Sequence, residues 1–112
     1  MRYHVLTRNG DFVRAYTKGK SFVHSEAVLY VNKNRVGKTR VGIVSSKKIG
    51  NAVTRNRARR VLRAALAEVL PREAGNYDIV LVARGQTPKC KSWHVAKTLR
   101  KLFAKAGICT NA

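Results

Sequence analysis

Cationic side chains recur at helical spacing in one stretch of the chain, and their chemistry is that of phosphate binding. They are Arg55, Arg57, Arg59, Arg60 and Arg63. Arg59 and Arg63 continue from Arg55 at four-residue steps, whereas Arg57 falls on the far flank. Like charges at that spacing destabilise a helix by about 0.2–0.5 kcal/mol per pair, so the pattern indicates a polyanion that compensates. Arginine also favours bidentate contacts with phosphates or bases.

Two lysines precede this expected helix. Lys47 and Lys48 come shortly before Asn51, whose side chain is suited to cap a helix N-terminus. Free N–H groups at such a terminus attract anions. No acidic residue occurs between Glu26 and Glu68, a stretch that holds eleven Lys and Arg residues. The turn and the helix are therefore predicted to form one phosphate-binding site.

Aromatic side chains supply a second candidate surface. Phe12 and Tyr16 are four residues apart in an expected helix, and Tyr30 lies in an expected strand that could form a sheet face beneath it. Such a face could stack the bases of an unpaired strand. The alternative is that the three are ordinary core residues. For Phe12 the two interpretations are equally good. For the two tyrosines the surface site is favoured, because their hydroxyls prefer contact with water. Trp93 is assigned to the core or its edge.

Groups that could catalyse a reaction on the protein itself do not converge. His24, Ser25 and Glu26 are neighbours in an expected strand, so their side chains alternate between faces and are interpreted as exposed strand residues. Glu68 and Glu73 flank a proline and are interpreted as a solvated pair at a helix end. A catalytic site needs convergent reactive groups, so none is predicted on the protein.

The cysteines, Cys90 and Cys109, are too few for a disulfide framework, and a cytosolic protein would keep them reduced. Cys90 and His94 have the four-residue spacing of metal ligands on a helix. A structural zinc site needs four ligands, and no cluster supplies the others. The sequence therefore disfavours a zinc site.

The cationic stretch belongs to the longest expected helix, which runs from Ala52 until Pro71 stops it. An apolar stripe follows the opposite face at i, i+3, i+4 spacing and must pack on a core: Ala58, Val61, Leu62, Ala65, Leu66 and Val69. A second helix is expected from Ser92 to Ala106, with Phe103 among its inward side chains. A short helix is expected from Asp11 to Tyr16, with Asn9 or Asp11 as its cap.

Extended segments fill the intervals between these helices. Residues 21–32 and 39–45 read as strands joined by a turn over 33–38, and they are expected to form an antiparallel meander. Residues 77–84 carry a nearly continuous apolar run, typical of a strand covered on at least one face. The resulting order of helix, strands, helix, strand, helix predicts an α/β sandwich.

The composition agrees with a folded partner of nucleic acid. The chain has 112 residues, with 24 Lys and Arg against five Asp and Glu and a net charge of +19. That length predicts one domain over residues 1–112, and the charge draws polyanions. A hydrophobic content of 45% argues against wholesale disorder. No secretion signal or membrane span is recognisable, so a cytoplasmic protein without membrane contact is expected.

Residues 40–57 read Arg-Val-Gly-Ile-Val-Ser-Ser-Lys-Lys-Ile-Gly-Asn-Ala-Val-Thr-Arg-Asn-Arg. This segment resembles the bacterial ribonuclease P protein subunit, whose hallmark Arg-Asn-Arg motif corresponds to Arg55-Asn56-Arg57. The resemblance extends to Asp11-Phe12, Leu29-Tyr30, Tyr77-Asp78-Ile79-Val80 and Ala83-Arg84, and so covers most of the chain.

The resemblance implies an α+β fold of the ribosomal protein S5 domain 2-like type, with element order αβββαβα and a left-handed βαβ crossover, an exception to the usual handedness rule. It also implies that the protein joins a large catalytic RNA, with which it removes the 5′ leader from precursor tRNA. The RNA would carry the chemistry with Mg²⁺, which it would mainly hold itself. No organic cofactor, protein-borne metal ligand or obligate protein partner is implied.

The resemblance also implies roles for individual residues. The leader would lie in a cleft between the first helix and the sheet, formed by Phe12, Tyr16 and Tyr30. The Arg-Asn-Arg helix and the turn before it would border the cleft and meet the catalytic RNA and metal-bound phosphates. Its residues are Lys47, Lys48, Asn51, Arg55, Asn56, Arg57, Arg59, Arg60 and Arg63.

Proteins of two other function classes would carry the same excess of positive charge. A structural RNA-binding protein, such as a small ribosomal protein, would bind RNA without supporting cleavage, and the Arg-Asn-Arg signature argues against it. A DNA-compacting protein would bind duplex DNA strongly and be indifferent to RNA fold. The aromatic residues favour single-stranded RNA instead.

Overall fold

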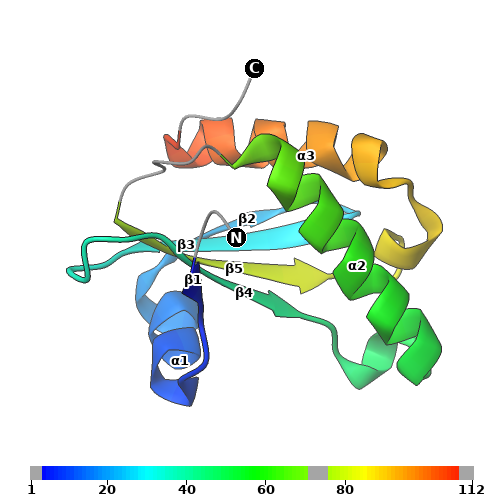
Figure 1. Ribbon diagram of the computed structural model, residues 1–112, viewed down its shortest axis with the longest axis horizontal. Coiled ribbons are helices and arrows are strands. Elements are labelled where there is room, and N and C mark those ends of the chain that lie inside the picture. Colours follow the sequence, from blue (N-terminus) through cyan, green and yellow to red (C-terminus); the bar gives the residue numbers. More distant parts are fainter. Residues whose placement is uncertain (1–3, 71–75, 109–112) are drawn as a thin grey trace.

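A computed structural model describes residues 4–70 and 76–108 of the chain. Figure 1 shows the arrangement of its helices and strands. Their bounds are β1 His4–Val5, α1 Asn9–Lys18, β2 Lys20–Val23, β3 Ala27–Lys33, β4 Arg40–Val44, α2 Ala52–Val69, β5 Tyr77–Ala83 and α3 Ser92–Ala106, with short 3-10 helices η1 Lys47–Ile49 and η2 Thr87–Lys89. The predicted order is confirmed, except that the two-residue strand β1 precedes the first helix. This strand was not predicted, because two residues are too few to show the alternation of apolar and polar side chains that marks a strand.

The strands form one mixed sheet in the order β1-β4-β5-β3-β2. The predicted antiparallel meander is confirmed for β2 and β3, which pair antiparallel, but it is wrong for β4, because β5 lies between β3 and β4. It pairs antiparallel with β3 and parallel with β4. The central strand of the sheet is β5, which carries the nearly continuous apolar run and whose residues 78–81 are all buried. A strand covered on both faces excludes more apolar surface there than at an edge.

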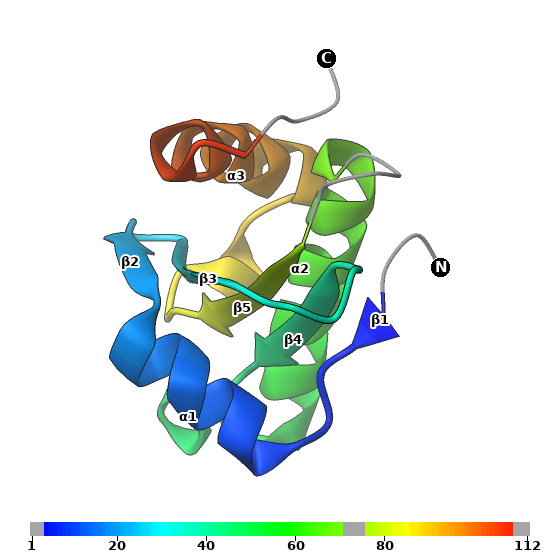
Figure 2. The ribbon, with the colours of Figure 1, turned by 90° about the vertical axis from the view of Figure 1, so that its left-hand side faces the viewer.

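The connection from β4 through α2 to β5 joins two parallel neighbours. In Figure 2 these strands point away from the viewer, α2 lies on the upper side of the sheet, and β5 lies to the left of β4. This is the left-handed sense, as the sequence resemblance implied, against the usual right-handed rule.

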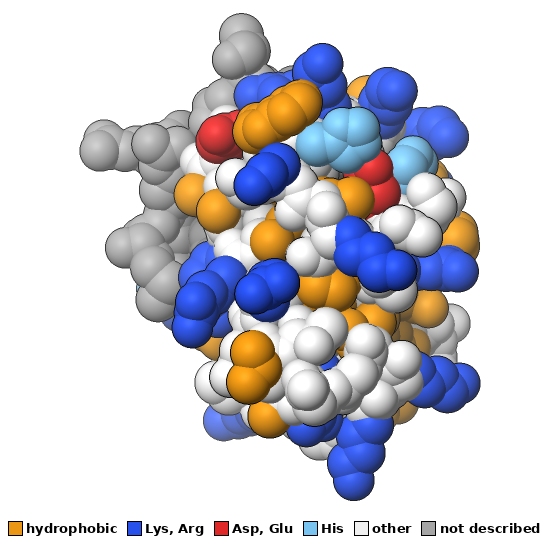
Figure 3. All heavy atoms as spheres, turned by 90° about the vertical axis from the view of Figure 1, so that its right-hand side faces the viewer, with side chains coloured by type: hydrophobic (Ala, Val, Ile, Leu, Met, Phe, Trp, Pro, Cys, Tyr) orange, Lys and Arg blue, Asp and Glu red, His pale blue; other side chains and the backbone are white. Residues whose placement is uncertain are grey.

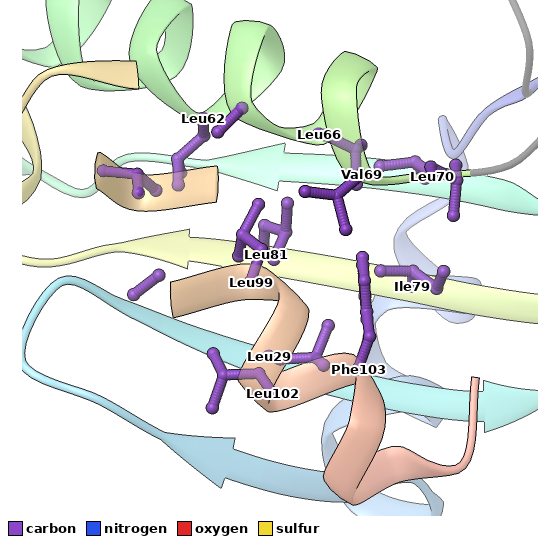
Figure 4. Packing of buried hydrophobic residues seen from close by; sticks show 14 of the residues in the cluster. Leu29, Leu62, Leu66, Val69, Leu70, Ile79, Leu81, Leu99, Leu102 and Phe103 are labelled. Atoms are coloured by element: carbon purple, nitrogen blue, oxygen red, sulfur yellow. The ribbon is translucent and has the colours of Figure 1, made fainter. Parts of the chain in front are cut away.

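The main hydrophobic core lies between the sheet and the pair α2 and α3. Figure 4 shows Leu62, Leu66 and Val69 of α2, with Leu70 just after its end, and Leu99, Leu102 and Phe103 of α3. They pack against the odd-numbered side chains of the central strands, such as Leu29 and Leu81. The predicted inward stripe of α2 is confirmed, because its buried residues are Ala58, Leu62, Ala65, Leu66 and Val69. Val61 is only partly buried, against the edge of this core.

The other face of the sheet carries α1 (Figure 2). Even-numbered residues of β3, β4 and β5 point to it, and a smaller cluster forms there around Leu6, Ala15 and Val80. Because α1 has only 10 residues, it covers less of the sheet than the helices opposite. One sheet thus carries a thick apolar layer on one side and a single short helix on the other.

Three expectations about individual residues are corrected. Neither Asn9 nor Asp11 caps α1: the cap position is Arg8, which makes no side-chain capping bond, and Asp11 is buried inside the helix. Trp93 is not core but 58% exposed, because it points away from the sheet on α3. Glu26 is not an exposed strand residue but is 7% exposed, in the turn between β2 and β3. No helix in the described ranges is both long and apolar enough to span a membrane.

Candidate nucleic-acid interface

The N-terminus of α2 is organised by Asn51. Its side-chain oxygen accepts hydrogen bonds of 2.9 Å from the backbone N–H and the hydroxyl of Thr54, which confirms the predicted cap. Gly50 has a φ of +143°, a conformation that other residues rarely adopt, and it turns the chain from η1 into α2. Lys47 and Lys48 are therefore held, exposed, immediately before the helix.

The arginines of α2 divide between two flanks of the helix. Arg55 and Arg59 are half-buried and Arg63 is exposed, and the three lie along one flank at four-residue steps. Arg57 and Arg60 are exposed and face η2 and the start of α3 across a hollow in the surface. Asn56 accepts a hydrogen bond from the guanidinium of Arg59, so the amide of the Arg-Asn-Arg motif orients a neighbouring cation.

The acidic side chains do not neutralise this surface, because most of them point inward. Asp11, Glu26 and Asp78 are all buried. Among the described residues, Glu68 is the one exposed acid. The solvent-facing surface is therefore more strongly positive than the composition alone requires, and a field of one sign draws in and concentrates polyanions.

Two of these acids form a network with Arg40 beneath α1. The guanidinium of Arg40 donates two hydrogen bonds of 2.8 Å to the carboxylate of Asp78 and a third, of 3.3 Å, to Asp11. The amide of Asn34 donates to the same carboxylate at 2.8 Å. The hydrogen bond to Asp78 raises the pKa of Arg40 above its usual range. The network joins α1, β4, β5 and the turn before β4.

Glu26 is fixed by α3. Its carboxylate accepts a hydrogen bond from the hydroxyl of Thr98 and lies 2.5 Å from the imidazole of His94. Burial, followed by the charge of Glu26, raises the pKa of the Cys90 thiol, which favours its protonated, unreactive form. Within residues 4–70 and 76–108, no three potential metal-ligating side chains gather; Glu73 and Cys109 lie outside the described residues.

The three candidate stacking residues lie together on the α1 side of the sheet. The ring of Phe12 packs on the backbone of Gly42, where any β-carbon would collide with it. Tyr16 and Tyr30 meet edge to face, with ring centroids 4.9 Å apart. Phe12 and Tyr30 are half-buried and Tyr16 is 40% exposed, so the group is neither sealed in the core nor fully in solvent. Burial raises the pKa of Tyr16, which keeps its hydroxyl protonated at neutral pH.

The structure does not bring all predicted residues to one place. The aromatic residues accompany α1 on one face of the sheet, whereas α2 and its arginines cover the other. The chain passes from one surface to the other around η1, two residues after the end of β4, whose last residue Val44 packs in the α1-side cluster.

Sequence reasoning missed two groups of cations. Lys89 and Lys91 meet the α2 arginines across their hollow. On the α1 side, Arg14, Lys18, Lys33 and Arg35 line a second hollow of about 450 Å³. Lys89 and Lys91 belong to another segment than the α2 arginines that they face, and Arg14 and Lys18 belong to another element than Lys33 and Arg35. Spacing within one segment could therefore not reveal either group.

Known proteins are similar to this chain in sequence and in fold. The Ribonuclease P family model matches residues 1–107. The chain is 36% identical to the ribonuclease P protein component of Clostridioides difficile over 104 residues, which is 92% of this chain and 91% of that protein. It matches the structure of the Staphylococcus aureus RNase P protein with a TM-score of 0.76 at 29% identity, covering 92% of this chain and 94% of that one. For the RNase P protein from Thermotoga maritima, the TM-score is 0.73 at 28% identity, with 88% and 94% covered. This chain belongs to the ribonuclease P protein family.

Proposed function

We propose that this protein is the subunit that joins a catalytic RNA to form ribonuclease P, and that the assembly removes the 5′ leader of precursor tRNA. The observation that carries the proposal is the cationic face of α2 and η1, combined with acids that are turned into the fold. A surface field of one sign suits a partner that is anionic along its length. An RNA backbone matches it along its whole length.

The side chains suit binding and positioning. The buried carboxylates are engaged with Arg40, Thr98 and His94, and the interface is built of arginine, lysine, amide and aromatic groups. These groups neutralise phosphate charge and orient an RNA strand, and positioning alone lowers a reaction barrier substantially. In this proposal the hydrolysis of the phosphodiester is carried by the RNA.

Mg²⁺ is the metal that the proposed reaction implies, and its preferred ligands are oxygen anions. The buried carboxylates do not fit a protein-borne Mg²⁺ site, because Asp11 and Asp78 are bound by Arg40 and Glu26 is enclosed by α3. In this proposal, phosphate oxygens of the RNA supply the ligands. Lys47, Lys48 and the arginines of α2 would approach the same phosphates from the protein side.

The α1 side of the sheet suits the single-stranded leader. Phe12, Tyr16 and Tyr30 present ring surface and two hydroxyls at a half-open site, and aromatic stacking holds unpaired bases with little sequence preference. The hollow lined by Arg14, Lys18, Lys33 and Arg35 lies beside α1 and would take the phosphates of the same strand.

The test is cleavage of a precursor tRNA by a bacterial ribonuclease P RNA at low millimolar Mg²⁺, with and without this protein. The proposal expects the protein to increase the rate of release of the 5′ leader. Binding of the RNA without any effect on cleavage would make a structural RNA-binding protein the better account.

A further inference from the structure

A hollow of about 580 Å³ lies between α2 and the segment that runs from η2 into α3. Its rim carries four cations: Arg57 and Arg60 from α2, and Lys89 and Lys91 from the η2–α3 segment. Val61 and Pro88 are among the apolar residues of its lining, which contains no acid. Figure 3 views this end of the molecule, where Lys and Arg side chains surround exposed hydrophobic atoms.

The lining favours one class of occupant. Four cations at a single opening repel one another, and a phosphate backbone is the partner that relieves this repulsion. The volume is within the range of about 300–1,000 Å³ typical of small-ligand sites, which a single nucleotide fits. An apolar wall below a cationic rim suits a base that has left a duplex, because paired bases cannot turn their faces to a protein.

The first turn of α3 adds an aromatic surface beside this hollow. Ser92 lines the hollow, and Trp93 is the next residue, with 58% of its surface exposed. The ammonium of Lys97 lies 5.9 Å from the ring centroid. An exposed tryptophan accompanied by cations is typical of sites where bases stack.

We propose that this hollow and Trp93 bind an unpaired segment of the catalytic RNA, with phosphates on the rim lysines and a base against apolar or aromatic surface. The inference rests on the proposed function and extends the RNA contact from α2 to η2 and α3. The occupant is the catalytic RNA rather than the leader, because the candidate leader site lies on the other face of the sheet.

The first test measures the affinity for ribonuclease P RNA as a function of salt. The double variant Lys89→Ala/Lys91→Ala removes two rim cations and leaves the arginines of α2 intact. It is expected to weaken binding about tenfold at moderate salt and to lower the salt slope by about 1.4, since each phosphate contact with a single strand contributes about 0.7. Lys101→Ala/Lys105→Ala, two exposed positions farther along α3, is the matched control and should retain the wild-type slope.

The second test uses Trp93, the only tryptophan of the chain, as a fluorescent reporter. Its emission should be quenched when the catalytic RNA binds and unchanged when a leader oligonucleotide binds. Trp93→Ala should weaken binding of the catalytic RNA by about fivefold or more, and Trp93→Phe should restore most of the affinity. Circular dichroism of each variant checks that the fold is retained.

The outcomes separate this inference from the proposed function. If wild-type protein stimulates leader cleavage but Lys89→Ala/Lys91→Ala behaves as its control does, the inference is wrong and the proposed function stands. Quenching by the leader oligonucleotide alone would also overturn it. If wild-type protein does not stimulate cleavage at all, the proposed function fails first.

Discussion

Arg40 and Asp78 face each other across neighbouring strands and are joined by two parallel hydrogen bonds of 2.8 Å. Asp78 is only 1% exposed, and the same guanidinium reaches Asp11 on α1. The pair therefore fixes the short helix on the sheet, and with it the aromatic residues that α1 carries. It also removes two acidic side chains from a surface that is proposed to bind phosphate.

Asp78→Ala should be strongly destabilising. The change leaves the guanidinium of Arg40 without its principal partner, and removal of one member of a buried ion pair costs about 3–5 kcal/mol. Urea denaturation followed by circular dichroism measures the free energy of unfolding. Arg14→Ala is the control, because it removes a 3.4 Å contact with Asp11 from a side chain that is 54% exposed and should cost less than about 1 kcal/mol. Equal losses in the two variants would contradict a structural role for the buried pair.

Gly42→Ala should displace the ring of Phe12. A β-carbon at position 42 would overlap that ring, and overpacking of this kind costs about 1–3 kcal/mol. In a double-mutant cycle, Phe12→Ala should make Gly42→Ala nearly neutral, because the colliding ring is then absent. If the free-energy changes of the two substitutions simply add, the proposed packing is wrong.

Replacing Arg55, Arg59 and Arg63 together by alanine should weaken association with the catalytic RNA and reduce its dependence on salt. Each phosphate contact with a duplex contributes about 0.9 to the slope of log affinity against log salt, so loss of three contacts lowers the slope by about 2.7. A variant that removes three cations elsewhere, Lys20, Lys101 and Lys105, controls for net charge. A triple-arginine variant with the wild-type slope would remove this flank of α2 from the interface.

Sulfate or phosphate should stabilise the folded protein in the absence of RNA. The net charge of +19 opposes compaction, and an anion that binds only the native state adds about 2.7 kcal/mol at a concentration of 100 times its Kd. Thermal unfolding at increasing sulfate, compared with chloride at equal ionic strength, distinguishes binding from general screening. Identical curves in the two salts would show that no specific anion site is occupied.

The parts of the fold that depend on local pattern were predictable. Asn51 predicted the start of α2, and the apolar stripe through Leu62 and Leu66 predicted its buried face. Both could be predicted because capping and helical periodicity depend on residues that are close in the sequence. The pairing of the strands could not be predicted, because the position of β5 depends on which strand can be covered on both faces once α2 and α3 have packed. The sequence order of β3 and β4 suggested a hairpin that the sheet does not contain.

The candidate interface was predictable to a similar extent. The arginines of α2 could be found because they share one helix and one period. Lys89, Lys91 and Trp93 could not, because their relation to α2 exists only after the chain has folded. Glu26 was misjudged for the same reason. Its partners Thr98 and His94 belong to α3, and Thr98 is 72 residues away in the sequence. Local reasoning assigns such a carboxylate to solvent.

The central claim is that the protein assists ribonuclease P RNA by holding the leader of the substrate. The most direct measurement is the rate of cleavage of precursor tRNAs with progressively shorter leaders, by the RNA alone and with the wild-type protein or Tyr30→Ala. The account predicts a stimulation by wild-type protein that declines as the leader is shortened, and a Tyr30→Ala variant that responds less to leader length. Stimulation that is independent of leader length, or no stimulation, would contradict it.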